Sequence, residues 1–227
     1  MVWLRNGTTF FNTTTAAFTQ DGENISETFA RLMPAVLAAP ADCGGLLALP
    51  FMDDEPGLNV QTGPSTATIL GWTPDNAKPG NVIKAALLAT VMNLKTGVQV
   101  LVQEQGVVEL QEIVLSGGLV KTPALGQVVA DVFDVPVRLL AAADEGSSWG
   151  AAVMAAYRHV VANGMSSPLS VPSWCDFLQN VASQRPVPTL FTPQPDQVQV
   201  YGRVYAKYQK LRALEGAVRD LQRGDNS

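Results

Sequence analysis

The region between residues 112 and 162 alternates strand and helix patterns, and this alternation constrains the fold more than any other feature of the sequence. Two short β-type runs, Glu112–Leu115 and Val135–Leu140, are each followed by a helical pattern, Pro123–Phe133 and Gly146–Ala162. Strands and helices that alternate at this spacing form β–α–β units with parallel strands and a right-handed crossover. We therefore predict an α/β fold.

A glycine pair lies directly after the first of these strands. Gly117 and Gly118 have no side chains, so a flat ligand can approach the backbone closely there. Lys121 and Thr122 follow, and the next helix offers free N–H groups at its start. Ligands of open α/β sheets bind at the carboxyl ends of strands. A plain tight turn explains the same residues, because strand–glycine–helix turns are common, so both interpretations stay open.

The composition narrows the class of protein. Apolar residues make up 47% of the 227 residues and charged residues 15%, which supports a sizeable buried core. The net charge of -5 comes without basic runs, which argues against nucleic-acid and anionic-membrane partners. Cys43 and Cys175 are too far apart in sequence to suggest a disulfide framework or a zinc site. No apolar run approaches the roughly 20 residues of a membrane span, and no signal peptide is recognisable. We expect a cytoplasmic protein.

The other elements follow from apolar spacing, glycines and prolines, and residues 1–24 give no clear period. A short helix begins at Ile25 and is loosened by Pro34. The remaining expected elements are a short strand after Gly45, a strand at Ala67–Trp72, a long helix at Val82–Glu104, a proline-rich connection over 165–198 carrying a short helix at Trp174–Val181, and a terminal helix at 199–222.

The segment around the glycine pair resembles the adenosine-binding segment of FGGY carbohydrate kinases. The matching residues are Ser116–Leu119, Lys121–Pro123, Gln127, Ala130–Phe133 and Pro136–Val137, in a form similar to ribulokinase-like members. Downstream, Glu145–Ala152 is similar to the glycine–alanine helix start of xylulokinase-like members. Weaker similarity lies in Gly45–Pro50 with Glu55–Pro56, in Gly71–Thr73 and in the tyrosine helix that follows Phe191–Pro193. The resemblance covers about residues 40–215.

This resemblance implies an actin-like (ribonuclease H-like) ATPase lobe, with a mixed sheet flanked by helices. Residues 1–227 would be the C-terminal nucleotide-binding lobe of a two-lobed sugar kinase, incomplete at its N-terminus and without the N-terminal lobe. The cofactors would be ATP and Mg²⁺, and the nucleotide would be bound by Gly117, Gly118, Leu119, Lys121 and Thr122. The family's catalytic base, an Asp, has no counterpart in this sequence. We therefore assign no catalytic residue and no metal ligand to this chain.

The sequence departs from the family pattern at Phe51–Pro56, where Arg and Thr are missing, so phosphate contact by this loop is in doubt. Asp53–Glu55 fits a water-mediated Mg²⁺ site, but three acids in a turn are usually a solvated loop. His159, the only histidine, fits a surface or packing role better than that of a base. The stripe of Tyr201, Tyr205 and Tyr208 fits core packing better than ligand stacking.

The favoured function is transfer of the γ-phosphoryl group of ATP to a sugar hydroxyl, with a pentulose as the expected sugar. The sugar would be a partner through the missing lobe, and this fragment alone would be inactive or nearly so. An apolar face that normally meets the missing lobe makes a homo-oligomer plausible. A non-catalytic actin-like module for assembly or regulation is the alternative. A dinucleotide-binding enzyme is weakly supported, because the G-x-G-x-x-G spacing is missing.

Overall fold

The computed structural model describes residues 4–61, 63–106, 110–116, 122–139, 146–163, 172–183 and 188–223. The chain divides into two compact units. Unit 1 comprises residues 1–110, 131–134 and 193–227, and unit 2 comprises residues 111–130 and 135–192. The expected α/β fold is confirmed, with helices and short strands in both units.

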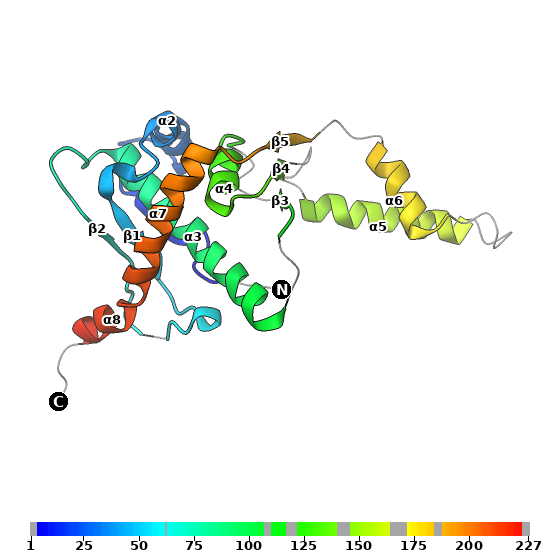
Figure 1. The fold of residues 1–227 in the computed structure, drawn as a ribbon. Helices are drawn as coiled ribbons and strands as arrows, with labels where there is room; N and C mark the ends of the chain where they lie inside the picture. The colour runs from blue at the N-terminus through cyan, green and yellow to red at the C-terminus, as the bar shows by residue number, and fades with distance from the viewer. Residues whose placement is uncertain are drawn as a thin grey trace. The chain divides into compact units, whose positions relative to one another are not determined.

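Unit 1 is built around the long helix α3 (Pro79–Gln105). Helices α1 (Thr9–Ala16), α2 (Ile25–Ala38) and α7 (Pro195–Arg212) and strand β1 (Leu47–Leu49) all contact it (Figure 1). The Pro79–Val102 stretch has the length and hydropathy of a membrane span, but 56% of its most apolar window is buried inside the protein. Core helices meet the same criterion, and we read α3 as the core helix of unit 1.

Helix α2 is longer than the sequence predicts, because it continues through Pro34 to Ala38. A capping box fixes its start: the Asn24 side chain accepts the N–H groups of Ser26 and Glu27, while the Glu27 carboxylate accepts the N–H of Asn24. Its apolar residues pack against α3. This packing offsets the hydrogen bond that a proline removes from a helix.

The other small elements of unit 1 surround this core. Strand β1 pairs antiparallel with β2 (Thr68–Leu70), and short 3-10 turns occur at Cys43–Gly45 and Pro56–Leu58. The expected terminal helix at 199–222 is two helices, α7 and α8 (Glu215–Arg223). The predicted packing role of the tyrosine stripe is confirmed, since Tyr201, Tyr205 and Tyr208 are all buried.

Unit 2 contains a mixed three-stranded sheet in the order β3-β4-β5. Strand β3 (Ile113–Leu115) is parallel to β4 (Val137–Leu139), as predicted, and β4 is antiparallel to β5 (Thr189–Phe191). Strand β5 lies inside the expected proline-rich connection, where apolar spacing predicts only a short helix.

Three helices accompany this sheet. Helix α4 follows β3 and spans Leu125–Phe133, and the boundary between the units falls within it, after Ala130. Helix α5 (Gly146–Asn163) follows β4. Helix α6 (Trp174–Ser183) confirms the short helix expected in the connection. The Trp174 ring meets the Tyr157 ring of α5 edge-on, and the Phe177 ring meets it at a tilt.

Candidate functional site

The predicted nucleotide site lies at the carboxyl end of β3. Four of its predicted residues, Gly117, Gly118, Leu119 and Lys121, lie outside the described residues. Thr122 is the one predicted site residue that the structure describes, and it is half-buried at the entrance to α4. Because β3 and β4 are parallel, their carboxyl ends meet at the same edge of the unit 2 sheet.

Thr122 begins the turn that leads into α4. Its carbonyl oxygen accepts the N–H of Leu125 at 2.9 Å, and the carbonyl of Pro123 accepts the N–H of Gly126 at 2.8 Å. The α-helix therefore begins at Leu125, two residues later than the sequence predicts. The Thr122 hydroxyl makes no hydrogen bond with any other residue in the described part of the chain, so it is available to a ligand.

The start of α5 lies beside the end of β3. A Cβ atom built on Gly146 would be 3.5 Å from Ser116 Cβ and 3.9 Å from Ser116 Oγ. The first turn of a helix presents unpaired N–H groups, which bind anions and other acceptors. Local spacing does not predict the contact between Ser116 and Gly146, because 29 residues separate them in the sequence. The site therefore joins the end of a parallel strand to a helix N-terminus.

Helix α4 is anchored to the end of β5. A Cβ on Gly126 would come within 2.6 Å of the Phe191 ring, so only glycine allows the helix to approach this closely. Gln127 Nε2 donates to the carbonyl oxygen of Thr192 at 2.9 Å. Both contacts lie within unit 2, and they hold the helix that follows the glycine pair.

An ion pair crosses the same sheet away from the site. Arg138 of β4 donates to both carboxylate oxygens of Glu112, at 2.6 and 2.8 Å. This hydrogen bonding lowers the pKa of Glu112 below its ordinary value. Arg138 lies in register between Val114 and Leu190, whose side chains are exposed. The pair contributes to the sheet rather than to the candidate site.

The acidic turn at Asp53–Glu55 is occupied by contacts within unit 1. Glu55 is fully buried and accepts the backbone N–H groups of Arg5 and Asn6, both at 2.9 Å. Asp54 pairs with the Arg5 guanidinium. Within the described ranges, no three His, Cys, Asp or Glu side chains are grouped so that they could hold a metal ion. The carboxylates of Asp53 and Asp54 both face the Arg5 guanidinium, so all three acids are engaged in contacts within unit 1.

His159 and the two cysteines take no part in the candidate site. His159 is exposed on α5, where its ring contacts the amide of Asn163 at 2.8 Å. Cys43 is a buried free thiol and Cys175 an exposed one. Burial raises the pKa of Cys43 to about 12.

Comparison with known proteins gives a consistent result. The model of the FGGY family of carbohydrate kinases, C-terminal domain, matches residues 2–159. The xylulose kinase of Rhodospirillum rubrum is 22% identical, with a TM-score of 0.67 over 92% of this chain and 38% of that kinase. The gluconate kinase of Lactobacillus acidophilus is 17% identical, with a TM-score of 0.65 over 96% of this chain and 40% of the kinase.

A glycerol kinase of Plasmodium falciparum, solved with ADP, is also similar. It is 17% identical, with a TM-score of 0.58 over 82% of this chain and 36% of that protein. The chain thus spans between 36% and 40% of the length of these three solved kinases and shares their fold over that part. A search of curated proteins found no match.

Proposed function

Because the chain belongs to the FGGY family of carbohydrate kinases, as a C-terminal domain, we propose that it is the ATP-binding lobe of a sugar kinase with an actin-like, ribonuclease H-like fold. The complete enzyme would transfer the γ-phosphoryl group of ATP to a sugar hydroxyl. One observation carries the proposal for this chain. The start of α5 lies beside Ser116 at the end of β3, and Thr122, whose hydroxyl makes no hydrogen bond within the described residues, opens the turn into α4.

In this proposal, each of these residues contacts a different part of the nucleotide. The side-chain-free backbone at Gly117 and Gly118, with Leu119, would border the adenosine, and the Thr122 hydroxyl would hydrogen-bond the base or ribose. Lys121 would cover the edge of the pocket. The first-turn N–H groups of α5 would face acceptor atoms at the end of β3. Mg²⁺, when bound with ATP, would neutralise charge that develops on the transferred phosphoryl group.

The catalytic base belongs, in this proposal, to the part of the kinase that this sequence does not contain. This sequence has no counterpart of the family's Asp base, and the chain spans only 38% of the length of the similar xylulose kinase. We therefore propose that the fragment binds nucleotide weakly and does not turn over. The sugar, reached through the N-terminal lobe, is proposed to be a pentulose, which the fold similarity to xylulose kinase supports.

The proposed setting is the cytoplasm, with a small-molecule sugar as partner and neither nucleic acid nor membrane. Two unpaired thiols, one of them exposed, fit a reducing compartment. A net charge of -5 fits the exclusion of polyanionic partners.

The test is calorimetry of this chain with ADP and with ATP at millimolar concentration. We expect weak binding that the Thr122→Val variant reduces about fivefold, as loss of one hydrogen bond predicts. Thr13→Val, on the exposed face of α1, is the matched control and should bind like the parent chain. If the longer kinase binds nucleotide and this chain does not, the pocket needs both lobes. If neither binds, the proposal is wrong.

One observation favours an alternative, a non-catalytic actin-like module used in assembly or regulation. The Phe51–Pro56 loop lacks the family's Arg and Thr, and its Glu55 is committed to internal hydrogen bonds. An activity assay of the complete protein distinguishes the two functions. Sugar-dependent ADP release with a panel of ketoses supports the kinase, whereas nucleotide binding without any turnover supports the module.

A further inference from the structure

One edge of the unit 2 sheet is unpaired within the described part of the chain. The strand order β3-β4-β5 leaves β3 at this edge (Figure 1). Ile113 donates its N–H toward β4, to the carbonyl oxygen of Pro136, at 2.9 Å. Because hydrogen-bonding directions alternate along a strand, the N–H and C=O of Val114 point away from β4, and no described residue pairs with them. The edge therefore offers a backbone donor and a backbone acceptor to another strand.

The side chains of this edge strand are apolar. Strand β3 consists of Ile113, Val114 and Leu115, and Val114 is 53% exposed. Residues 106–120 contain no proline, lysine or arginine. Proteins commonly guard an edge strand with prolines and lysines against pairing with another chain. The β3 edge lacks these guards and so has the composition of an edge that accepts a further strand.

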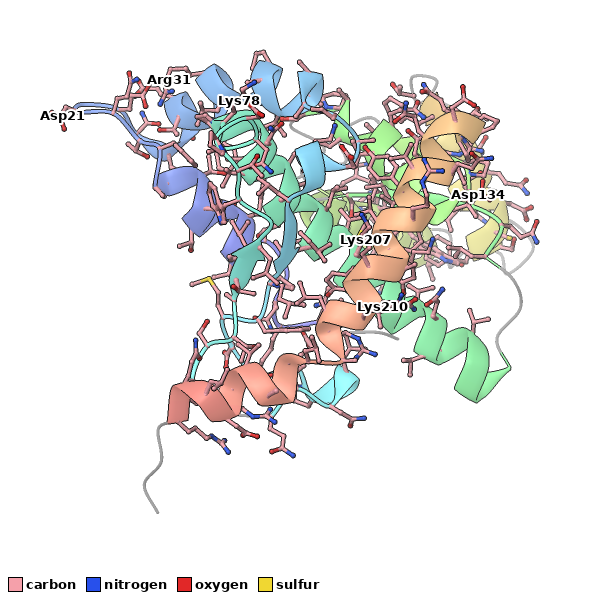
Figure 2. All side chains as sticks on the ribbon, turned by 60° about the vertical axis from the view of Figure 1, so that its left-hand side comes forward. Asp21, Arg31, Lys78, Asp134, Lys207 and Lys210 are labelled. Atoms are coloured by element: carbon pink, nitrogen blue, oxygen red, sulfur yellow. The ribbon has the colours of Figure 1, made fainter. Side chains whose placement is uncertain are left out.

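The opposite edge of the same sheet is guarded. Pro188 comes directly before β5 and Pro193 follows two residues after it, and proline has no N–H to donate to an added strand. Charge guards other exposed surfaces, as on α7, where Figure 2 shows Lys207 and Lys210 along the helix and both are exposed. Of the two edges of the unit 2 sheet, β3 is the one open to pairing.

We infer that β3 is an interaction surface for a second copy of this chain, with the two β3 strands antiparallel about a two-fold axis at Val114. In this register the two Val114 residues exchange both of their backbone hydrogen bonds, and the two sheets become one continuous sheet. Isologous pairing of this kind needs a strand that complements itself.

The sequence of β3 satisfies that requirement. In the two-fold register Ile113 lies opposite Leu115, and Glu112 lies opposite Ser116, so no two like charges face each other. The Glu112 carboxylate is already paired with Arg138 of its own sheet at 2.6 Å. The inference concerns association alone, and it holds whether or not the chain binds a nucleotide.

Sedimentation velocity of the 227-residue chain over a concentration series tests the inference. We expect a dimer at about 100 µM and a monomer on dilution, as a small interface predicts. Val114→Lys places two like charges directly opposite each other and should weaken dimerisation at least about tenfold. Leu190→Lys is the matched control and should leave dimerisation unchanged. Leu190 is 55% exposed and lies in register with Val114 across the sheet, but on the guarded edge strand.

Charge reversal separates pairing from misfolding. An equimolar mixture of the Val114→Lys and Val114→Glu variants should restore the dimer, because opposite charges then face each other. A variant that merely disturbs the fold would not be rescued in this way. Hydrogen exchange gives a direct measurement on the parent chain: the Val114 amide should gain protection as concentration rises, whereas the Ile113 amide, already bonded to Pro136, should not.

Three results would overturn the inference. A chain that stays monomeric at every concentration would leave the β3 edge to a strand of another protein. Equal weakening of the dimer by Val114→Lys and Leu190→Lys would place the contact elsewhere. A mixture of the Val114→Lys and Val114→Glu variants that remains monomeric would show that the two Val114 residues do not face each other.

Discussion

Glu55 shows how one buried carboxylate can organise a chain terminus. Its oxygens accept the N–H groups of Arg5 and Asn6, the side-chain amide of Asn6 at 3.1 Å and that of Asn93 at 3.3 Å. Asn6 also donates to the carbonyl oxygens of Asp53 and Asp54. The N-terminal segment, the acidic turn and α3 are therefore joined through one side chain. A buried carboxyl group is tolerated when its oxygens are hydrogen-bonded this fully.

Substitution of Glu55 tests this network. Glu55→Gln keeps one acceptor oxygen but places an NH₂ group against a backbone N–H donor, so we expect a loss of about 2 kcal/mol in the free energy of unfolding. Urea denaturation measures it. Asp53→Asn is the matched control, since its carboxylate is 65% exposed and should matter by less than about 0.5 kcal/mol. Equal stability of the two variants would show that Glu55 is not the organising group.

The two thiols differ in burial and should therefore differ in reactivity. Burial raises the pKa of Cys43 to about 12, so almost no reactive thiolate forms there at pH 8. Cys175 is exposed at the start of α6. Ellman's reagent should therefore release one thiolate per native chain and two in guanidinium chloride. The Cys175→Ser variant should not react while folded. Rapid reaction of that variant would mean that the Cys43 region opens readily.

Elements differ in how well local sequence predicts them. The β3–α4–β4 pattern and α5 follow from apolar spacing, and the structure confirms them to within two or three residues. The break between α7 and α8 does not follow, because the buried Glu215 is held by Thr66, 149 residues away. Local sequence also fails to predict the edge strand β5, because this segment is a strand only through its pairing with β4. Long-range contacts leave no local periodic signal.

Two helical glycines differ in the space that an added side chain would meet. A Cβ on Gly80 would lie 2.4 Å from the carbonyl oxygen of Ala35, so α2 and α3 can meet this closely only at a glycine. Gly80→Ala should cost about 2 kcal/mol through overpacking. A Cβ on Gly202 of α7 would meet nothing within 4 Å, so Gly202→Ala should stabilise by about 0.5 to 1 kcal/mol. Urea denaturation of both variants gives the comparison, and two changes of the same sign would contradict the α2–α3 packing.

At the scale of the whole molecule, the two units have unequal cores. The buried apolar residues of unit 2, within the described ranges, are Leu125, Val128, Val129, Ala130, Val137, Leu139 and Val153. Unit 1 holds the others, including most of α3 and the tyrosine face of α7. Sequence alone predicts the α/β class but not this division, since its boundary cuts α4 after Ala130 without any break in the helical pattern.

Because unit 2 buries fewer apolar residues than unit 1 within the described ranges, we expect the two units to unfold at different denaturant concentrations. Stability depends on the apolar surface that each unit buries, so native-state hydrogen exchange in urea should show unit 2 opening at lower denaturant concentration than unit 1. Amides of α5, where only Val153 is buried, should exchange first, and amides of α3 between Val82 and Met92 should exchange last. The Glu55→Gln variant sharpens the measurement, because it should lower protection in unit 1 and leave unit 2 unchanged. A single opening transition shared by α3 and α5 would mean that the chain unfolds as one cooperative body, and the division into two units would then carry no energetic meaning.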